Sequence, residues 1–384
     1  MGFQWARFRQ DPRHQDDLGR LRSEPGTHAL ILGVSTYLPA ARQRFGLPDL
    51  DCAALSALRI AHWLVDSYRS ASGAPLASLR LLLSPSDLER SSAAPADLAD
   101  VPACTRHNVA LALEEWVEDL DSAGGNVAFL YGAGHGMRYQ GDGPILLLED
   151  FWKPRGVANA LDFSRSNLGL EGFRLRASFM FADCCQETNE MVDTVQGTQP
   201  LCAAWDPGQP QRRESWGLYR AAAGGGYAYG QRGGTTNFVE ALIDGLNGRS
   251  ATAEDSGRWE VTTDSLKATL PGLVAERHAE QVVRPTSEGP RPGALHGLDQ
   301  PPMANLSVSV HPGEHAPTSS GWIDRSGTVF DRFTFADHPY TRPVESGSYR
   351  VGVEARPALP FVQPVKDVPV RPFGGGAVRF EVRS

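Results

Sequence analysis

The chain has 384 residues, with 45 acidic and 37 basic side chains and a formal net charge of −8 at pH 7. This length corresponds to about two or three domains, and the mild acidity excludes a general electrostatic attraction to nucleic acid. No apolar run approaches the roughly 18 residues that span a bilayer, and the charged N-terminus lacks a signal-peptide core. Five cysteines are an odd number, unlike a disulfide framework. We therefore expect a cytoplasmic protein with reduced thiols and neither nucleic acid nor membrane as a partner.

The first three quarters of the chain alternate between strand and helix patterns. Polar residues 1–27 are predicted to form a mobile tail, and the Ser-, Ala-, Asp- and Pro-rich residues 84–104 a loop. Apolar runs predict buried strands and amphipathic runs predict helices: strands over residues 28–34, 79–83, 126–131, 176–182 and 217–223, and helices over residues 51–68 and 105–120, after Thr235 or Thr236, and over residues 264–276. This alternation predicts a mainly parallel sheet, which binds ligands at the carboxyl ends of its strands.

The last part of the chain has a different pattern. Short, mostly alternating runs separated by Gly, Pro and Ser cover residues 305–310, 328–335, 348–355 and 377–382. They predict a small β-sandwich or barrel. We therefore expect a first domain over residues 28–290, a linker over residues 291–303 and an all-β domain over residues 304–384.

Two short motifs follow the third and fourth predicted strands of the first domain. In FLYGAGHGMRY, His135 lies between Gly134 and Gly136 just past a buried strand. Glycines there permit a tight turn and close approach of a substrate, and a histidine can act as a base or acid near neutral pH. The alternative is a loop histidine without a role, which the flanking glycines and the position at the strand end disfavour.

The second motif, SFMFADCCQE, brings Asp183, Cys184 and Cys185 to the same edge of the sheet. A cysteine thiolate is a strong nucleophile when a base can generate it. Because neighbouring strand residues point to opposite faces, only one of the two adjacent thiols should face the cleft. The histidine precedes Cys185 by 50 positions, the spacing typical of caspases. The other cysteines are predicted to be core or loop thiols: Cys52, Cys104 and Cys202.

Together these motifs resemble those of the caspase and metacaspase group of cysteine proteases, in particular bacterial caspase-like proteins. The resemblance covers roughly residues 28–285 and includes HALILGVSTY for the first strand. GLYRAAAGGGYAYGQRGGTTNFVEALIDGL and WEVTTDSLKATL resemble the small-subunit half of the family. It implies a three-layer α/β sandwich around a mainly parallel sheet, followed here by a small all-β domain. It also implies a cysteine endopeptidase that acts on a protein substrate.

Residue by residue, the resemblance implies that His135 is the catalytic histidine. The family pattern Asp-x-Cys assigns Cys185 as the nucleophile and places Cys184 at the variable middle position. Gly136 matches the glycine whose N–H forms the oxyanion hole with that of Cys185. Metacaspases carry an aspartate where Asp183 stands, and it lines a pocket for Arg or Lys at P1. The alternative is that Asp183 only caps a turn.

Two features depart from the metacaspase pattern. The second aspartate of the family is replaced by Ser56, although Asp49 and Asp51 are nearby. Arg42 and Arg44 occupy the loop where caspases that cut after aspartate place an arginine for the acidic P1 side chain. The preference for a basic P1 residue would fail if either arginine pointed into the pocket.

The stretch over residues 191–215 corresponds to the inter-subunit linker of the family. It contains Arg212 and Arg213, which predict a self-processing site if the enzyme cuts after basic residues. The alternative is a solvated loop in which the two arginines have no such role. Mass spectrometry of the wild type and Cys185→Ala would distinguish these possibilities.

Two other classes of function compete with a protease. A catalytically silent caspase-like binding module would keep the fold and lack turnover. A metal site built on His135, Cys184 and Cys185 is disfavoured, because adjacent cysteines chelate one ion poorly and no fourth ligand is evident. We therefore expect no cofactor. Calcium activates some metacaspases, but the acidic residues 114–121 are more typical of an exposed helix face.

The resemblance also implies a biological setting. Bacterial proteins of this kind often act in antiphage defence, where they cleave a gasdermin-like pore former or another effector. The all-β domain would then dock a partner or a sensor, or cap the protease. No motif in its sequence distinguishes these roles.

Overall fold

The computed structural model describes residues 24–139, 143–152, 156–187, 199–203, 213–255, 257–355 and 359–383. The contacts divide the chain into two compact units, Met1–Leu246 with Val261–Gly297 and Asn247–Glu260 with Leu298–Ser384. In these ranges no helix is long and apolar enough to cross a membrane. The predicted tail over residues 1–27 lies almost wholly outside the described residues, which begin three positions before the first strand.

A six-stranded sheet forms the centre of the first unit, in the order β11-β8-β7-β3-β1-β2. The neighbouring pairs from β8 to β2 are parallel, and only β11 runs antiparallel to its neighbour. The mainly parallel sheet expected from the sequence is therefore present. The strands are β1 (Thr27–Val34), β2 (Leu76–Ser84), β3 (Asn126–Gly134), β7 (Leu175–Cys184), β8 (Trp216–Arg220) and β11 (Arg284–Glu288).

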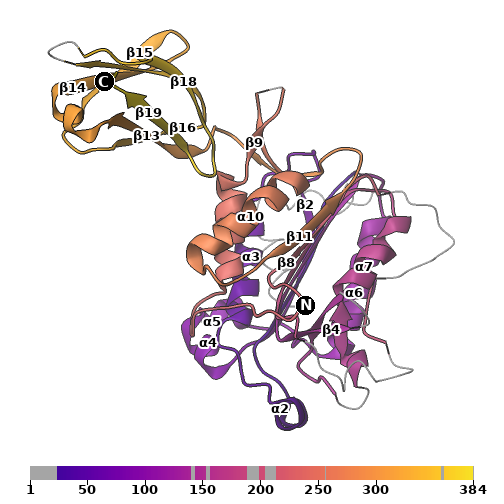
Figure 1. Ribbon diagram of the computed structural model, residues 1–384. Coiled ribbons are helices and arrows are strands. Elements are labelled where there is room, and N and C mark those ends of the chain that lie inside the picture. Colours follow the sequence, from indigo (N-terminus) through magenta and orange to yellow (C-terminus); the bar gives the residue numbers. More distant parts are fainter. Residues whose placement is uncertain are drawn as a thin grey trace. The chain divides into compact units, whose positions relative to one another are not determined.

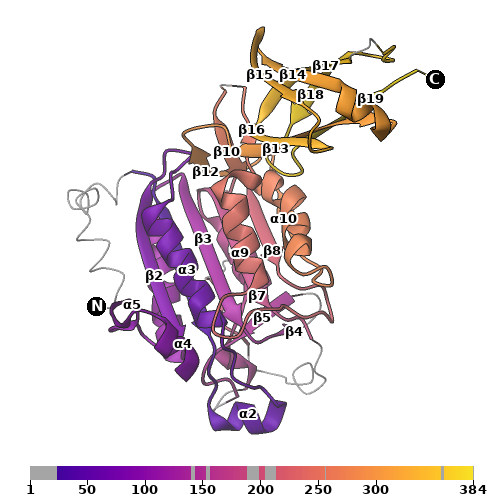
Figure 2. The ribbon, with the colours of Figure 1, turned by 90° about the vertical axis from the view of Figure 1, so that its left-hand side faces the viewer.

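Helices cover both faces of this sheet, which gives the expected three layers (Figure 1). One face carries α3 (Ala53–Asp66), α9 (Asn237–Asp244) and α10 (Thr263–Arg277), which Figure 2 shows in front of the strands. The other carries α6 (Arg106–Asp121) and α7 (Phe163–Gly169). Because both faces are covered, every residue of β1, β2 and β3 is buried. The predicted caps Thr105 and Thr236 each accept a backbone N–H of the first helical turn.

Several shorter elements were not predicted. A three-stranded antiparallel sheet follows β3 directly and is formed by β4 (Gly136–Tyr139), β5 (Gly143–Leu147) and β6 (Ala160–Asp162). A further three-stranded sheet has the order β12-β10-β9 and is formed by β9 (Thr252–Ala253), β10 (Trp259–Thr262) and β12 (Ala294–Leu298). A short helix, α2 (Pro39–Phe45), follows β1, and single turns cover Val157–Asn159, Leu170–Gly172, Gly245–Arg249 and Gly313–Thr318.

The structure corrects two predictions about irregular segments. The predicted loop over residues 84–104 contains α4 (Asp87–Ser92) and α5 (Pro95–Leu98), and α4 begins at a capping box formed by Ser86 and Glu89. The predicted linker over residues 291–303 contains β12, where the ring of His296 packs edge-on against Trp63 at 5.0 Å and accepts the N–H of Arg69. Residues 291–297 therefore belong to the first unit, and residues 298–303 belong to the second.

The second unit contains two β-sheets around one apolar core, as expected for a small all-β domain. The sheets have the orders β16-β13-β19 and β15-β14-β17-β18. Inward-facing residues from both form a single cluster that includes Leu306, Ile323, Val351 and Phe380. The strands are β13 (Met303–His311), β14 (Ser319–Arg325), β15 (Thr328–Thr334), β16 (Tyr340–Glu345), β17 (Gly347–Ala355), β18 (Val365–Val370) and β19 (Gly376–Glu381).

Candidate active site

A pocket of about 290 Å³ lies at the carboxyl ends of β3 and β7. These two strands are parallel neighbours, with Gly134 opposite Cys184 in the register. The residues that directly follow these two strands are His135 and Cys185. They therefore lie at the same edge of the sheet, and both line the pocket. The N-terminal end of α3 and the loop between β8 and α9 form the other walls.

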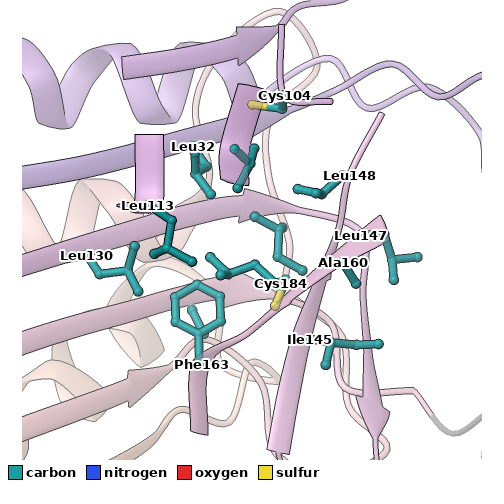
Figure 3. Close-up of a cluster of buried hydrophobic side chains, with 14 of the residues drawn as sticks. Leu32, Cys104, Leu113, Leu130, Ile145, Leu147, Leu148, Ala160, Phe163 and Cys184 are labelled. Carbon is teal, nitrogen blue, oxygen red and sulfur yellow. The ribbon is translucent and has the colours of Figure 1, made fainter. Parts of the chain in front are cut away.

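The two adjacent cysteines have different surroundings. Cys184 is the last residue of β7 and is 1% exposed, packed in the core with Ile145 and Phe163 (Figure 3). Cys185 is only partly buried and lines the pocket. This is the opposite orientation that strand alternation predicts for neighbouring residues. Only Cys185 is therefore placed to meet a substrate.

Hydrogen bonds orient the ring of His135. Its Nε2 lies 2.9 Å from the carbonyl oxygen of Pro48, and its backbone N–H donates to the hydroxyl of Tyr37 at 2.8 Å. A carbonyl can only accept, so Nε2 carries the proton and Nδ1 keeps a lone pair. Burial lowers the pKa of His135, while the Pro48 carbonyl opposes this shift. The imidazole is therefore neutral near pH 7, the state in which Nδ1 can accept a proton.

The surroundings of Cys185 favour the protonated thiol over the thiolate. Burial raises the pKa of Cys185, and the carboxylates of Glu187 and Asp183 raise it further. The backbone N–H of Ala228 lies 3.3 Å from Sγ and acts in the opposite direction, because it can donate to a thiolate. A thiolate at Cys185 would therefore require a base to remove the proton, and the N–H of Ala228 is in place to donate to it.

Gly136 begins β4 and lies against the segment after β7. Leu147 donates to the carbonyl of His135, so Gly136 and Leu146 form a pair without mutual hydrogen bonds, and the Gly136 N–H points away from β5. The N–H of Arg138 points the same way and donates to the carbonyl of Glu187. A Cβ on Gly136 would lie only 2.6 Å from the Cys184 Sγ and from the Cys185 oxygen, so no larger residue fits. The peptide of Gly136 is therefore held beside Cys185.

Asp183 is a pocket-lining carboxylate that is 2% exposed. Its Oδ2 accepts hydrogen bonds from Tyr131 at 2.6 Å and Thr236 at 2.5 Å. Its Oδ1 is buried and has no hydrogen-bond partner among the described residues. Burial raises the pKa of Asp183 to about 6, and the two hydroxyl donors only partly oppose this shift. The site thus contains a buried carboxylate that lacks a cation.

The two arginines that the sequence offered for an acidic P1 side chain, Arg42 and Arg44, lie outside the pocket. Arg42 donates to the carbonyl of Tyr37 at 2.7 Å and forms an ion pair with Asp49 at 2.6 Å. Arg44 stacks over Trp152 with its guanidinium carbon 5.0 Å from the ring centre. Neither arginine lines the pocket.

Several residues of this pocket were not selected from the sequence. Asp51, at the end of the loop before α3, and Arg232, in the loop before α9, both line it and form an ion pair. Gly230 lines it without a side chain, and a Cβ there would lie 2.6 Å from the Cys52 Sγ. Ser56, at the position of the second metacaspase aspartate, instead accepts the N–H of Thr236. No sequence signal indicated Arg232 or Gly230, because the loops that form the pocket meet only in the fold; Asp51 was noted only as a neighbour of Ser56, which does not line the pocket.

The structure separates the two arginines of the predicted processing site. Arg212 lies outside the described residues, whereas Arg213 is described and 4% exposed. Its Nη1 donates to the carbonyl and side-chain oxygens of Asn167 and to Ser178, at 2.8 to 3.0 Å. An enzyme pocket cannot reach a guanidinium held in this way. The prediction that Arg213 is a processing residue is therefore corrected, because its side chain anchors the start of β8 to β7 and α7.

Known proteins are similar to this chain in sequence or in structure. The family model of the caspase domain matches residues 27–270. Among solved structures, a Geobacter sulfurreducens protein is 14% identical, covering 70% of this chain and 95% of that one, with a TM-score of 0.42. Caspase-1 from Spodoptera frugiperda is 11% identical, covering 71% and 92%, with a TM-score of 0.42. No curated protein matches the sequence significantly.

Among the described residues, no three His, Cys, Asp or Glu side chains are grouped to hold a metal ion. Cys52 lines the pocket together with His135 and Cys185, whereas Cys184 is buried on the other side of the strand. The predicted alternative of a metal site on His135, Cys184 and Cys185 has no support in this arrangement.

Proposed function

The chain belongs to the caspase domain family, and from this premise we propose that it is a cysteine endopeptidase with Cys185 as nucleophile and His135 as base. One observation carries the proposal. The β3–β7 register brings both side chains to the same pocket, whereas the neighbouring Cys184 is buried in the core. The hydrogen bond from His135 to the Pro48 carbonyl supports the base role, since it leaves Nδ1 unprotonated.

The proposed reaction starts with transfer of the Sγ proton of Cys185 to Nδ1 of His135. The thiolate then attacks the scissile carbonyl carbon, and the N–H groups of Gly136 and Cys185 stabilise the oxyanion. The imidazolium returns its proton to the leaving amine as the C–N bond breaks. Water then attacks the carbonyl carbon of the acyl-enzyme and gives a proton to His135. As the C–S bond breaks, His135 returns this proton to the sulfur of Cys185, and the carboxylic acid product leaves.

We propose a basic P1 side chain for the substrate. The unpartnered Oδ1 of Asp183 supports this choice, because a buried carboxylate without a cation favours a ligand that supplies one. The location of Arg42 and Arg44 outside the pocket removes the two candidates for binding an acidic P1 side chain. The absence of a side chain on Gly230 leaves room for a long P1 residue.

The test combines labelling with turnover. An arginyl or lysyl chloromethylketone should alkylate Cys185 in the reduced wild type, located by peptide mass spectrometry, and fluorogenic peptides should show cleavage after Arg or Lys. Cys185→Ala should lose both signals. Cys202→Ala is the matched control, because Cys202 is partly buried and lies outside the pocket. Absence of an adduct and of turnover, with and without calcium, would favour a silent binding module.

Two further parts of the proposal concern physiology. We propose that self-processing follows Arg212, because the buried Arg213 is held by three acceptors. A mass shift at this bond in wild type and not in Cys185→Ala would support it, and intact wild type under activating conditions would contradict it. Resemblance to bacterial caspase-like proteins motivates a partner effector, such as a gasdermin-like pore former in antiphage defence, docked by the all-β unit. Co-expression with candidate effectors, with and without residues 304–384, tests that role.

A further inference from the structure

Arg232 places a positive charge in the wall of a pocket that is otherwise acidic. Its Nε donates to Oδ2 of Asp51 at 2.9 Å, and both residues line the pocket that contains Asp183 and Cys185. The Arg232 side chain is 84% exposed, whereas that of Asp51 is only 19% exposed. The arginine thus reaches from solvent onto a largely buried carboxylate.

The backbone around Arg232 is built to hold this pair. The N–H of Gly233 donates to the carbonyl oxygen of Asp51 at 2.8 Å, so the two loops are joined next to the ion pair. Gly233 has φ +71°, a left-handed conformation that favours glycine. On the other side, Oδ1 of Asp51 accepts from Ser86 at 2.8 Å. These contacts fix the position of the Asp51 carboxylate and the path of the chain through Arg232.

The pocket carboxylates differ in their partners. Asp49 is paired with Arg42 at 2.6 Å, and Asp51 is paired with Arg232. Asp183 has only hydroxyl donors on one oxygen and no partner on the other among the described residues. Asp49 and Asp51 are therefore each paired with an arginine. Asp183 has one carboxylate oxygen without a partner among the described residues.

We propose that Arg232 is a specificity-determining residue of the P1 pocket: it neutralises Asp51 and competes with a basic P1 side chain for the pocket's negative charge. This inference rests on the proposed function, since it assumes a P1 cation at Asp183. A planar guanidinium on Asp51 repels an incoming cation and withholds a second carboxylate from it. Arg232 thereby weakens the binding of basic P1 residues and leaves the reacting atoms untouched.

The opposite role, in which Arg232 receives an acidic P1 side chain, is disfavoured by its surroundings. An acidic P1 group at Arg232 would have to displace Asp51, whose carboxylate is held in place by Ser86. It would also add a fourth carboxylate to a pocket lined by Asp49, Asp51 and Asp183. Like charges in one pocket are destabilising.

The experiment compares Arg232→Gln with wild type on otherwise identical peptides with Arg, Lys, Asp or Glu at P1. Solvent screens the largely exposed guanidinium of Arg232, so the effect of replacing it should be moderate. Arg232→Gln should lower KM for peptides with basic P1 about three- to tenfold and leave kcat within about twofold. Arg232→Lys keeps the charge but loses the planar guanidinium, so its KM for basic P1 should lie between those of wild type and Arg232→Gln. Arg59→Gln is the matched control, because Arg59 is an exposed arginine that pairs with Glu240 outside the pocket.

A double-variant cycle tests whether the effect passes through Asp51. Asp51→Asn alone should raise KM for basic P1, because it removes a carboxylate from the pocket. In that background Arg232→Gln should improve KM by clearly less than it does in the wild type. Equal improvement in both backgrounds would contradict competition for Asp51.

A binding arm separates this inference from the proposed function. In the Cys185→Ala background, calorimetry with benzamidine, a planar amidinium, should show tighter binding when Arg232 is also replaced by Gln. If wild type cleaves after Arg and Lys but neither KM nor benzamidine binding responds to Arg232→Gln, the inference fails and the proposed function stands. Cleavage after Asp or Glu that Arg232→Gln abolishes would overturn both.

Discussion

Asp183→Asn should make the protein more stable and at the same time remove its proposed substrate preference. The amide oxygen can accept from Tyr131 and Thr236 as Oδ2 does now, and the NH₂ group would replace the unpartnered Oδ1. The substitution therefore keeps the shape and the two hydrogen bonds. It deletes the buried negative charge and places an NH₂ group at the position of Oδ1.

The size of the stability gain follows from the pKa. Burial raises the pKa of Asp183 from 3.8 to about 6, a shift that corresponds to about 3 kcal/mol. A folded-state pKa above the unfolded value means that the native state binds the proton more tightly. The free energy of unfolding therefore falls as the pH rises from about 4 to about 6, and the full cost is present at pH 7.5. Asp183→Asn should remove this cost, and a thermal midpoint about 5 °C higher is expected.

Activity should change in the opposite direction. Removal of a buried charge partner costs about 2–5 kcal/mol, so kcat/KM for peptides with P1 Arg should fall at least about 30-fold. Differential scanning fluorimetry at pH 7.5 and pH 4 measures stability, and the stability gain should disappear at the lower pH. An unchanged or lower thermal midpoint at pH 7.5 would refute the assignment of an uncompensated charge. Undiminished cleavage after Arg would refute the role of Asp183 in the pocket.

The control for this experiment is Asp162→Asn. Asp162 is also a buried carboxylate at the end of a strand, but its oxygen caps α7 by accepting the N–H of Arg165, and it lies outside the pocket. Asparagine caps a helix about as well as aspartate. The P1 preference of Asp162→Asn, measured on the same peptides, should match that of wild type.

Four other substitutions give expected outcomes. Cys185→Ala should abolish turnover with an unchanged thermal midpoint, whereas Cys184→Ser should lower the midpoint by placing a hydroxyl in an apolar core; the reverse pattern would exchange their roles. Gly136→Ala should lower kcat at least about tenfold or prevent folding, because its Cβ would lie 2.6 Å from the Cys185 oxygen, and wild-type kinetics would contradict the assigned position of this peptide. Arg213→Ala should lower the thermal midpoint because it removes buried hydrogen bonds, and mass spectrometry should find self-processing at the same bond as in wild type.

Local patterns predicted the layered part of the fold well. The apolar runs at residues 28–34, 126–131 and 176–182 match β1, β3 and β7, because strands buried on both faces must be apolar throughout. The missed helix α4 did have a local signal, since Ser86 and Glu89 have the spacing of a capping box. The abundance of Ser, Ala, Asp and Pro around that pair concealed it.

The buried Glu89 also shows where local patterns cease to inform. Its Oε1 accepts the N–H groups of Ala54 and Leu55 at the start of α3. A carboxylate there satisfies the otherwise unpaired donors at a helix N-terminus. This contact joins residues more than 30 positions apart, and the sequence pattern of neither segment predicts it.

The sequence by itself determined that His135 and Cys185 follow buried parallel strands and that Cys184 and Cys185 point in opposite directions. Both results depend only on local backbone geometry. Tertiary structure alone decided the charge of the pocket. Arg232 pairs with Asp51, 181 positions away in the chain, whereas one oxygen of Asp183 has no hydrogen-bond partner among the residues that the structure describes. Electrostatic pairing depends on distance and burial in space, and loops that meet only after folding set both.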